Sequence, residues 1–358
     1  MNHLSERDSR RNLALLAVDY VSYGVGVSFL GTTTVFPTLI RLLGGSPLVV
    51  GSVSAIQAGA FLLPQLFAGR HLANRPQVKS YVVATVIASR LLLSLGAPAL
   101  ALLALRAPAA AIAALLLSFG AFNVVDALAT VGWYELLAKA IPQDRRGRIF
   151  GLGQVLVSGM GIGVGLLVRE LLRRPDAFPE SYVVLWCLAA LAAGACPFFL
   201  ALVKEPARAV AGEHQPPWRE YLPQLGRILR RDARFAWITL VRWLAGLADM
   251  GAAFYVLYAT DRLGLPASMS GPFLSAMVAG SLACGLILGP LADRRGGVQP
   301  VIVLFMILRC LGPVLALLAP GAARVQPWLG IGLLLAVFFT AGVATGAFML
   351  GFNNYVLH

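Results

Sequence analysis

The sequence predicts an all-α membrane protein with ten transmembrane helices. Of its 358 residues, 58% are hydrophobic and only 13% are charged, which is too apolar for a water-soluble chain of this length. The apolar residues form long uninterrupted runs, which are typical of helices and not of barrel strands. The chain also repeats several landmarks at half its length, and this indicates a duplicated helical bundle.

The individual helices follow from the length of the apolar runs. A membrane-crossing helix needs roughly 20 apolar residues, and the charged or Pro/Gly breaks cut the chain into ten such spans. The first run is far longer than the apolar part of a secretion signal, so we expect it to remain as a helix. The predicted spans are 13–40, 47–69, 79–104, 108–139, 147–171, 181–203, 234–261, 268–291, 298–318 and 326–356.

Lys and Arg residues collect on one side of these spans. With the N-terminus in the cytoplasm, the inside segments hold most of them, including the basic segment 204–233. This asymmetry orients helices in membranes, so we expect an N-terminus inside and a bacterial cytoplasmic (inner) membrane. It also accounts for the net charge of +13 without a nucleic-acid partner. Segment 204–233 has helical apolar spacing, which leaves open a helix on the lipid headgroups or a plain connector.

The repeat is clearest in a short break between apolar runs. Residues 289–296 read Gly-Pro-Leu-Ala-Asp-Arg-Arg-Gly, and residues 69–75 read Gly-Arg-His-Leu-Ala-Asn-Arg, about 219 positions earlier. Arg90 and Arg309 keep the same offset, and residues 103–108 are similar to residues 315–320. The second repeat reaches the end of its fourth helix at His358.

These two motifs and the basic loop 142–148 together resemble the major facilitator superfamily over the whole chain. The resemblance implies two six-helix halves, a central cavity lined by helices 1, 4, 7 and 10, and alternating access. The first loop departs from the pattern, because Asn74 stands where the family carries Asp. Because the second repeat ends with its fourth helix, we expect a C-terminally truncated member. It would have a six-helix half at 1–203, a cytoplasmic linker at 204–233 and an incomplete four-helix half at 234–358.

Ionisable side chains within the spans are the first candidates for function. Each costs about 2.5–3.5 kcal/mol at mid-bilayer unless it has a partner or faces water. A carboxylate that alternates between water and an apolar environment can take up and release protons. On helices 1, 4 and 7, the candidates for substrate binding or proton coupling are Asp19, Tyr23, Asn123, Asp126, Arg242 and Asp249.

Each of these assignments has an alternative that the sequence leaves open. Asp126 can neutralise Arg90 as a static structural pair. Asp19 can lie near the cytoplasmic side, where water reaches it. Arg242 and Asp249 are about 10 Å apart along one helix, too far for a direct pair, and Arg242 keeps an anionic substrate possible.

A second set of candidates concerns the inner gate. Within the second motif, Gly289, Asp293 and Arg294 are the key residues, and the resemblance implies that Asp293 faces the N-terminus of the fifth helix, where exposed amides favour a carboxylate. Glu135 can form an ion-pair latch with Arg146, or can lie at a solvated helix end.

Taken together, these features predict a secondary active transporter, and not an enzyme. We expect it to move a small organic solute, neutral or cationic, by alternating access, with proton coupling and outward transport. An uptake permease, a facilitated carrier and a non-transporting fragment are the alternatives. The four histidines lie in loops or at termini and the cysteines lack metal-binding spacing, so we expect no cofactor and no metal. The expected partners are the solute, protons and the lipid bilayer, with the protein as a monomer.

Overall fold

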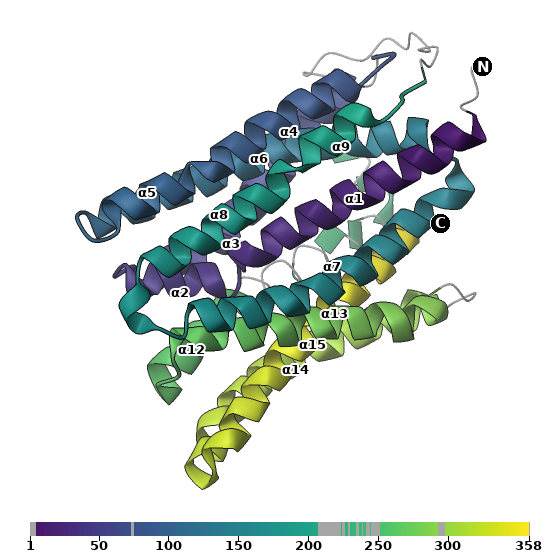
Figure 1. Ribbon diagram of the computed structural model, residues 1–358. Coiled ribbons are helices and arrows are strands. Elements are labelled where there is room, and N and C mark those ends of the chain that lie inside the picture. Colours follow the sequence, from purple (N-terminus) through teal and green to yellow (C-terminus); the bar gives the residue numbers. More distant parts are fainter. Residues whose placement is uncertain are drawn as a thin grey trace.

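Nine helical segments long and apolar enough to cross a membrane occur in the described part of the chain (Figure 1). The structure is a computed structural model. It describes residues 5–357 apart from 73–74, 207–222, 224–225, 228–229, 234–235, 238, 241–243, 245–250 and 293–297. Twelve of the 28 residues of the seventh predicted span, 234–261, lie outside the described residues, and its last ten residues belong to α12 (Ala252–Leu263).

Successive spans run in opposite directions through the bundle. We call the end where the chain enters α1 and leaves α9 the linker end, and the other end the far end. The first bundle consists of α1 (Glu6–Leu30), α2 (Val35–Leu42), α3 (Pro47–Leu72), α4 (Lys79–Ser94), α5 (Gly96–Leu103), α6 (Pro108–Ala140), α7 (Gln143–Leu171), the short η1 (Pro175–Ala177), α8 (Glu180–Gly194) and α9 (Cys196–Leu202). The second group consists of α12, η2 (Ala267–Met269), α13 (Ser270–Ala292), α14 (Val298–Val325) and α15 (Pro327–Leu357).

The first predicted span, 13–40, is two helices and begins earlier than expected. Ser5 caps α1, because its hydroxyl accepts the backbone N–H of Asp8 at 3.1 Å and so satisfies one of the free amides of the first turn. The helix stops at Gly31, whose φ of +47° lies in the left-handed region that glycine adopts without steric cost. The chain then turns and resumes as α2.

Two further spans are interrupted beside a proline. Pro98 and Pro197 lie in the first turns of α5 and α9, just after the breaks at Leu95 and Ala195. A proline has no N–H to donate to the carbonyl four residues earlier, so the preceding helix loses a hydrogen bond there. The indole of Trp186 on α8 donates to the Leu93 carbonyl at 2.8 Å, and this bond joins the two interrupted spans.

The helix starts at Pro108 and Pro327 fit the 219-residue offset of the repeat, but one of the predicted landmarks is wrong. Pro108 opens α6, whereas Pro320 lies inside α14, which continues to Val325 and past the predicted end at 318. The residue that corresponds to Pro108 is Pro327, which opens α15. Proline suits the first position of a helix, because the amide there has no partner within the helix.

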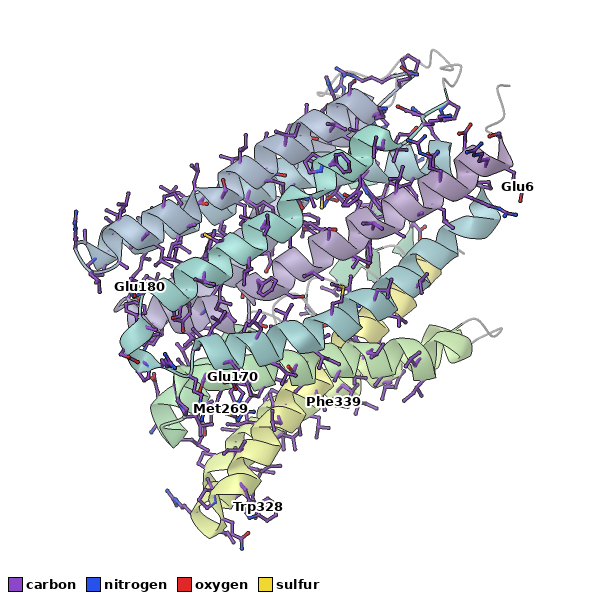
Figure 2. All side chains as sticks on the ribbon, viewed as in Figure 1. Glu6, Glu170, Glu180, Met269, Trp328 and Phe339 are labelled. Atoms are coloured by element: carbon purple, nitrogen blue, oxygen red, sulfur yellow. The ribbon has the colours of Figure 1, made fainter. Side chains whose placement is uncertain are left out.

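The two groups of helices meet along α7 and α13. In the first bundle α1 packs along α7, α8 and α9, while α6 packs along α3 and α4; in the second group α15 packs along α13 and α14. Figure 1 accordingly shows α4 to α6 on one side of the molecule and α14 and α15 on the other. Figure 2 shows Glu170, Glu180 and Met269 near the far end and Glu6 at the opposite end of α1.

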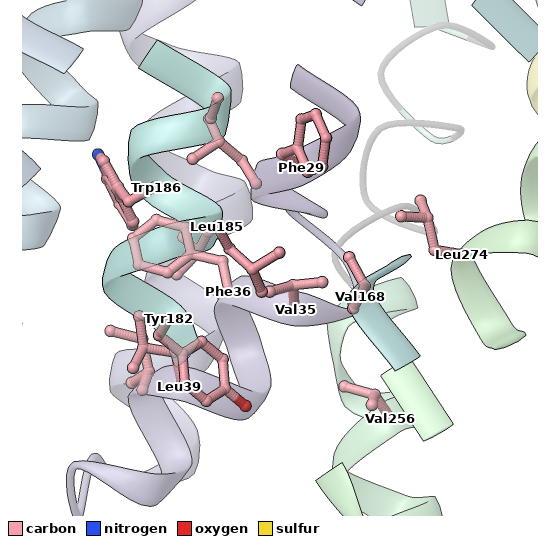
Figure 3. Close-up of a cluster of buried hydrophobic side chains, with 14 of the residues drawn as sticks. Phe29, Val35, Phe36, Leu39, Val168, Tyr182, Leu185, Trp186, Val256 and Leu274 are labelled. Carbon is pink, nitrogen blue, oxygen red and sulfur yellow. The ribbon is translucent and has the colours of Figure 1, made fainter. Parts of the chain in front are cut away.

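The main apolar core lies where the α1–α2 turn meets α8 (Figure 3). The ring of Phe36 packs edge-on against both Phe119 and Trp186, with centroids 5.2 Å apart in each case. Such edge-to-face pairs add to the stabilisation from buried area. The core continues through Val168 of α7 to Val256 of α12 and Leu274 of α13, so it connects the two groups.

Polar contacts also join the two groups towards the far end. Thr38 and Ser270 share a buried hydrogen bond of 2.9 Å, and Ser275 donates to the Ile162 carbonyl at 3.1 Å. Arg41 of α2 and Asp261 of α12 form an ion pair of 3.3 Å, with both side chains about half exposed. These contacts close the far end of the seam between the groups.

Replacing Gly271 with alanine should destabilise the protein. An added Cβ would meet backbone atoms of α7 at Gly165 and Arg169, and overpacking of this kind costs about 1–3 kcal/mol. The control is Gly285→Ala on the same helix, where an added Cβ meets nothing within 4 Å. Thermal unfolding in detergent should show a lower Tm for Gly271→Ala and no loss for Gly285→Ala. Equal Tm values for the two variants would contradict the close approach of α7 and α13.

Candidate functional site

Arg90 and Asp126 form a buried ion pair inside the first bundle. Arg90 Nη1 on α4 lies 2.5 Å from Asp126 Oδ1 on α6, and the two side chains are only 8% and 5% exposed. The guanidinium also lies over the rings of Tyr23 and Phe122, with its central carbon 4.9 and 5.5 Å from their centroids. Cation–π contacts of this kind offset part of the cost of desolvating the charge.

Tyr23 connects this ion pair to α1. Its hydroxyl donates to Asp126 Oδ2 at 2.9 Å, so both carboxylate oxygens of Asp126 are occupied. Asp126 therefore has a cation and a hydroxyl as partners. This geometry fits the alternative in which Asp126 forms a static structural pair with Arg90. Arg90 therefore points into the bundle.

Asp19 lies in the same seam with neutral partners. Its side chain is 4% exposed, and its Oδ2 accepts the indole N–H of Trp133 on α6 at 2.7 Å. The thiol of Cys196 on α9 lies 3.5 Å from its backbone carbonyl oxygen. No Lys, Arg or His in the described part of the chain forms an ion pair with it. Asp19 is thus buried in this structure and not open to water.

Aromatic rings from two helices lie against Trp133, the partner of Asp19. The ring centroids of Tyr20 and Trp133 are 6.4 Å apart, and Tyr134 stands edge-on to Trp133 at 5.3 Å. The Tyr20 hydroxyl donates to Gln154 Oε1 on α7 at 3.1 Å. Tyr134 is 54% exposed, so the ring cluster has an accessible edge.

The predicted polar face of α6 is present, but Asn123 does not take part in these bridges. Its side-chain amide donates to the Phe119 carbonyl one turn earlier at 2.7 Å. Thr130 likewise bonds the carbonyl of Asp126 within the helix. Side-chain bonds to the helix backbone are ordinary for such residues, so the spacing brought Asn123 to the right face without giving it an interhelical partner.

Several predicted site residues cannot be placed. Arg242, Asp249, Asp293 and Arg294 lie outside the described residues, and only the backbone of Arg146 is described. Gly289 lies in the last part of α13. The described partner of Glu135 is Lys139 on its own helix, at 3.4 Å.

An ionic cluster at the linker end was missed by the sequence analysis. The carboxylate of Glu205 accepts the backbone N–H groups of Val78 and Lys79 at 2.8–3.0 Å, which caps α4. Lys139 lies 3.6 Å from Glu205 and donates to the carbonyls of Arg75 and Pro76. Both charged side chains are almost fully buried, at 3% and 2% exposure. A charge just after a span looks solvated in sequence, and nothing in the local pattern signals that burial.

Described His, Cys, Asp and Glu side chains nowhere come together in the groups of three that hold a metal ion. The site therefore offers an ion pair, a carboxylate with neutral partners and a set of aromatic rings. Such groups can bind a solute or a proton, but they include no nucleophile with an adjacent base.

Comparison with known proteins now decides the family. The sequence model of the Major Facilitator Superfamily matches residues 21–358. The chain belongs to the Major Facilitator Superfamily. It is therefore an integral, multi-pass membrane protein of a transporter family, and not an enzyme. A comparison with curated protein sequences found no match.

Solved structures of Major Facilitator Superfamily transporters have the same fold at low identity. The nucleoside transporter NupG has a TM-score of 0.63 and 15% identity, with 98% of this chain and 82% of that chain covered. A bacterial homologue of the iron transporter ferroportin, in an inward-facing state, has a TM-score of 0.64 and 16% identity, with coverages of 97% and 84%. The E. coli fucose:proton symporter FucP has a TM-score of 0.53 and 17% identity, with coverages of 95% and 83%.

Breaking the Arg90–Asp126 pair should destabilise the protein far more than removing the charge of Asp19. Asp126→Asn leaves Arg90 buried without a counter-charge, which costs about 3–5 kcal/mol. The double variant Arg90→Met/Asp126→Asn should recover much of this loss, because no unpaired charge remains. Asp19→Asn keeps an acceptor for Trp133 and should cost little.

Denaturant unfolding in detergent for the parent, both single variants, Asp19→Asn and the double variant provides the test. The double-mutant cycle should show strong coupling between the two residues. Additive effects of Arg90→Met and Asp126→Asn, or an equally large effect of Asp19→Asn, would contradict this assignment.

Proposed function

We propose that the protein is a proton-coupled secondary active transporter of a small organic solute, with Asp19 as the residue that carries the proton. The observation that supports this most is the burial of Asp19, whose hydrogen-bond partners among the described residues, Trp133 and Cys196, are neutral. An ionised carboxylate in an apolar environment is costly, so Asp19 is stabilised whenever it binds a proton or another cation. A group with this property can couple a proton gradient to a change of conformation.

Asp126, the other sequence candidate for coupling, suits this role less well. Arg90 and Tyr23 occupy both of its oxygens, and protonating it would leave the guanidinium buried without a counter-charge. We therefore assign Asp126 to holding α1, α4 and α6 together, so that Asp19 and Trp133 keep their positions across the seam.

Alternating access would move residues 1–203 and 234–358 as two bodies joined by the linker 204–233. The ionic cluster of Lys139 and Glu205 supports a rigid first body, because it ties the linker ends of α4 and α6 to the start of the linker. The closed far end supports a conformation that opens towards the linker end. Under this proposal Asp293, within the second motif, acts at the gate that closes the linker end.

The orientation that we propose places the linker end in the cytoplasm of a bacterial cell, with export as the working direction. The excess of Lys and Arg in the segments at this end supports the orientation. Proton symporters of D-xylose and of fucose are among the structures of similar fold, and they support proton coupling as a property of this architecture.

Replacing Asp19 with asparagine should abolish gradient-driven transport while leaving passive exchange. The purified chain is reconstituted in liposomes and supplied with a metabolite extract, and a pH gradient is imposed in either direction. Mass spectrometry then identifies solutes that accumulate inside with the gradient and not with a protonophore. We expect at least one such solute for the parent and none for Asp19→Asn. The matched control is Asp8→Asn on the same helix, whose carboxylate pairs with Lys204 at the linker end.

Two outcomes would count against this proposal. If Asp19→Asn concentrates the solute as well as the parent does, Asp19 is structural and coupling lies elsewhere. If the parent equilibrates the solute but the gradient never concentrates it, the protein is a facilitated carrier.

Cysteine labelling should place the linker inside the cell. In a background without the exposed Cys187 and Cys310, a membrane-impermeant maleimide on intact cells should label Arg106→Cys, which lies at the far end. Gly212→Cys in the linker should react only after the cells are permeabilised. Labelling of Gly212→Cys from outside would reverse the proposed orientation.

A further inference from the structure

The charges buried in the first bundle do not balance. Lys139 and Glu205 pair with each other at the linker end. Deeper in the bundle, the described interior holds two carboxylates, Asp19 and Asp126, and one cation, Arg90, which Asp126 already neutralises. With both carboxylates ionised, one negative charge is left over, and it resides on Asp19. A buried charge without a counter-charge is unfavourable. One cation bound in the seam between α1 and α6 would neutralise the extra negative charge of the described residues.

The partners of Asp19 leave part of its carboxylate available. Trp133 donates to Oδ2, while Oδ1 takes no hydrogen bond from any N–H or O–H group of the described residues. A carboxylate oxygen can accept two hydrogen bonds. A cation beside Oδ1 would therefore gain a counter-charge, and a protonated amine would also gain an acceptor for its N–H group.

The surroundings favour an organic cation over an inorganic one. Trp133 contacts this carboxylate, and the rings of Tyr20 and Tyr134 lie against Trp133, with centroid separations of 6.4 and 5.3 Å. Aromatic faces attract cations, and several rings around one anion are the usual surroundings of a bound alkylammonium group. Hard metal cations need several oxygen ligands instead, and the described residues around Asp19 do not supply them.

We propose that Asp19, together with the rings of Tyr20, Trp133 and Tyr134, recognises an organic cation, a protonated or quaternary amine, as the transported solute. The inference rests on the proposed transport function and adds the chemical class of the substrate to it. The half-exposed Tyr134 is the accessible edge of the site, and Asp19 is its buried anchor.

A proton and the amine then compete for one carboxylate. The titratable groups that act on Asp19 from the helices around it are the thiol of Cys196, the guanidinium of Arg90 and the carboxylate of Asp126. The last two neutralise each other, so no described group compensates Asp19, and a proton and the amine would compete to do so. Binding of the amine should therefore weaken as the pH falls.

Equilibrium binding to the purified chain in lipid nanodiscs tests this without any gradient. The probe is benzyltrimethylammonium, whose charge does not change with pH, and the comparison is neopentylbenzene, its neutral isostere with carbon in place of nitrogen. We expect the cation to bind at least tenfold more tightly than the isostere, and to lose affinity at acidic pH. Asp19→Asn should remove both effects, Asp19→Glu should retain the preference for the cation, and Asp8→Asn should match the parent.

The outcomes separate this inference from the transport proposal. Equal binding of the cation and its isostere, or cation binding that survives Asp19→Asn in a protein with the parent's Tm, overturns the organic-cation assignment. Gradient-driven accumulation of a neutral or anionic solute in liposomes would still support transport in that case. Cation binding that depends on Asp19, without gradient-driven accumulation, would keep the site and refute proton coupling.

Discussion

The ion pair between Arg90 and Asp126 is the contact on which the centre of the first bundle depends. It joins α4 to α6, and the hydroxyl of Tyr23 extends it to α1. α1 packs mainly against α7, α8 and α9, and α6 packs against α3 and α4, so polar side chains do much of the work of holding α1 to α6. An apolar environment makes each unpaired charge expensive. The pair therefore stays formed, and Asp19 is a buried carboxylate to which no described residue supplies an ion-pair partner.

The two ends of the molecule are stabilised by different means. At the far end, glycines on α7 and α13 let the two backbones approach closely, and hydroxyl bonds and the Arg41–Asp261 pair supplement that packing. Small residues give close helix packing where the surrounding lipid supplies no hydrophobic drive for association. At the linker end, buried charges and helix caps fasten the first bundle internally. This difference suits a protein in which one body is rigid while the seam between bodies opens and closes.

Sequence reasoning identified the polar residues of the site, but it did not determine their pairing. Spacing along a helix places Asn123 and Asp126 on one face, yet Asn123 bonds its own helix and Asp126 bonds two others. The sequence also left open whether Asp126 would bind a proton or substrate or would pair with Arg90. Which of these occurs depends on the distance between neighbouring helices, and a single sequence does not contain that distance. Glu205 and Lys139 were overlooked for the same reason.

The fold class, the positions of nine described membrane helices, the repeat and the superfamily followed from the sequence alone. Those properties depend on the length and order of the apolar runs and on a loop motif that occurs twice in the chain. A bilayer permits few structures other than helices for such runs. The tertiary structure alone decided the helix breaks at Gly31, Leu95 and Ala195 and the counterpart of Pro108. It also decided that Arg90 pairs with Asp126 and Lys139 with Glu205. They depend on contacts between residues far apart in the chain. Local sequence cannot specify such contacts. The same side chain can face water, lipid or a partner residue, and the packing of the folded helices determines which of these it meets.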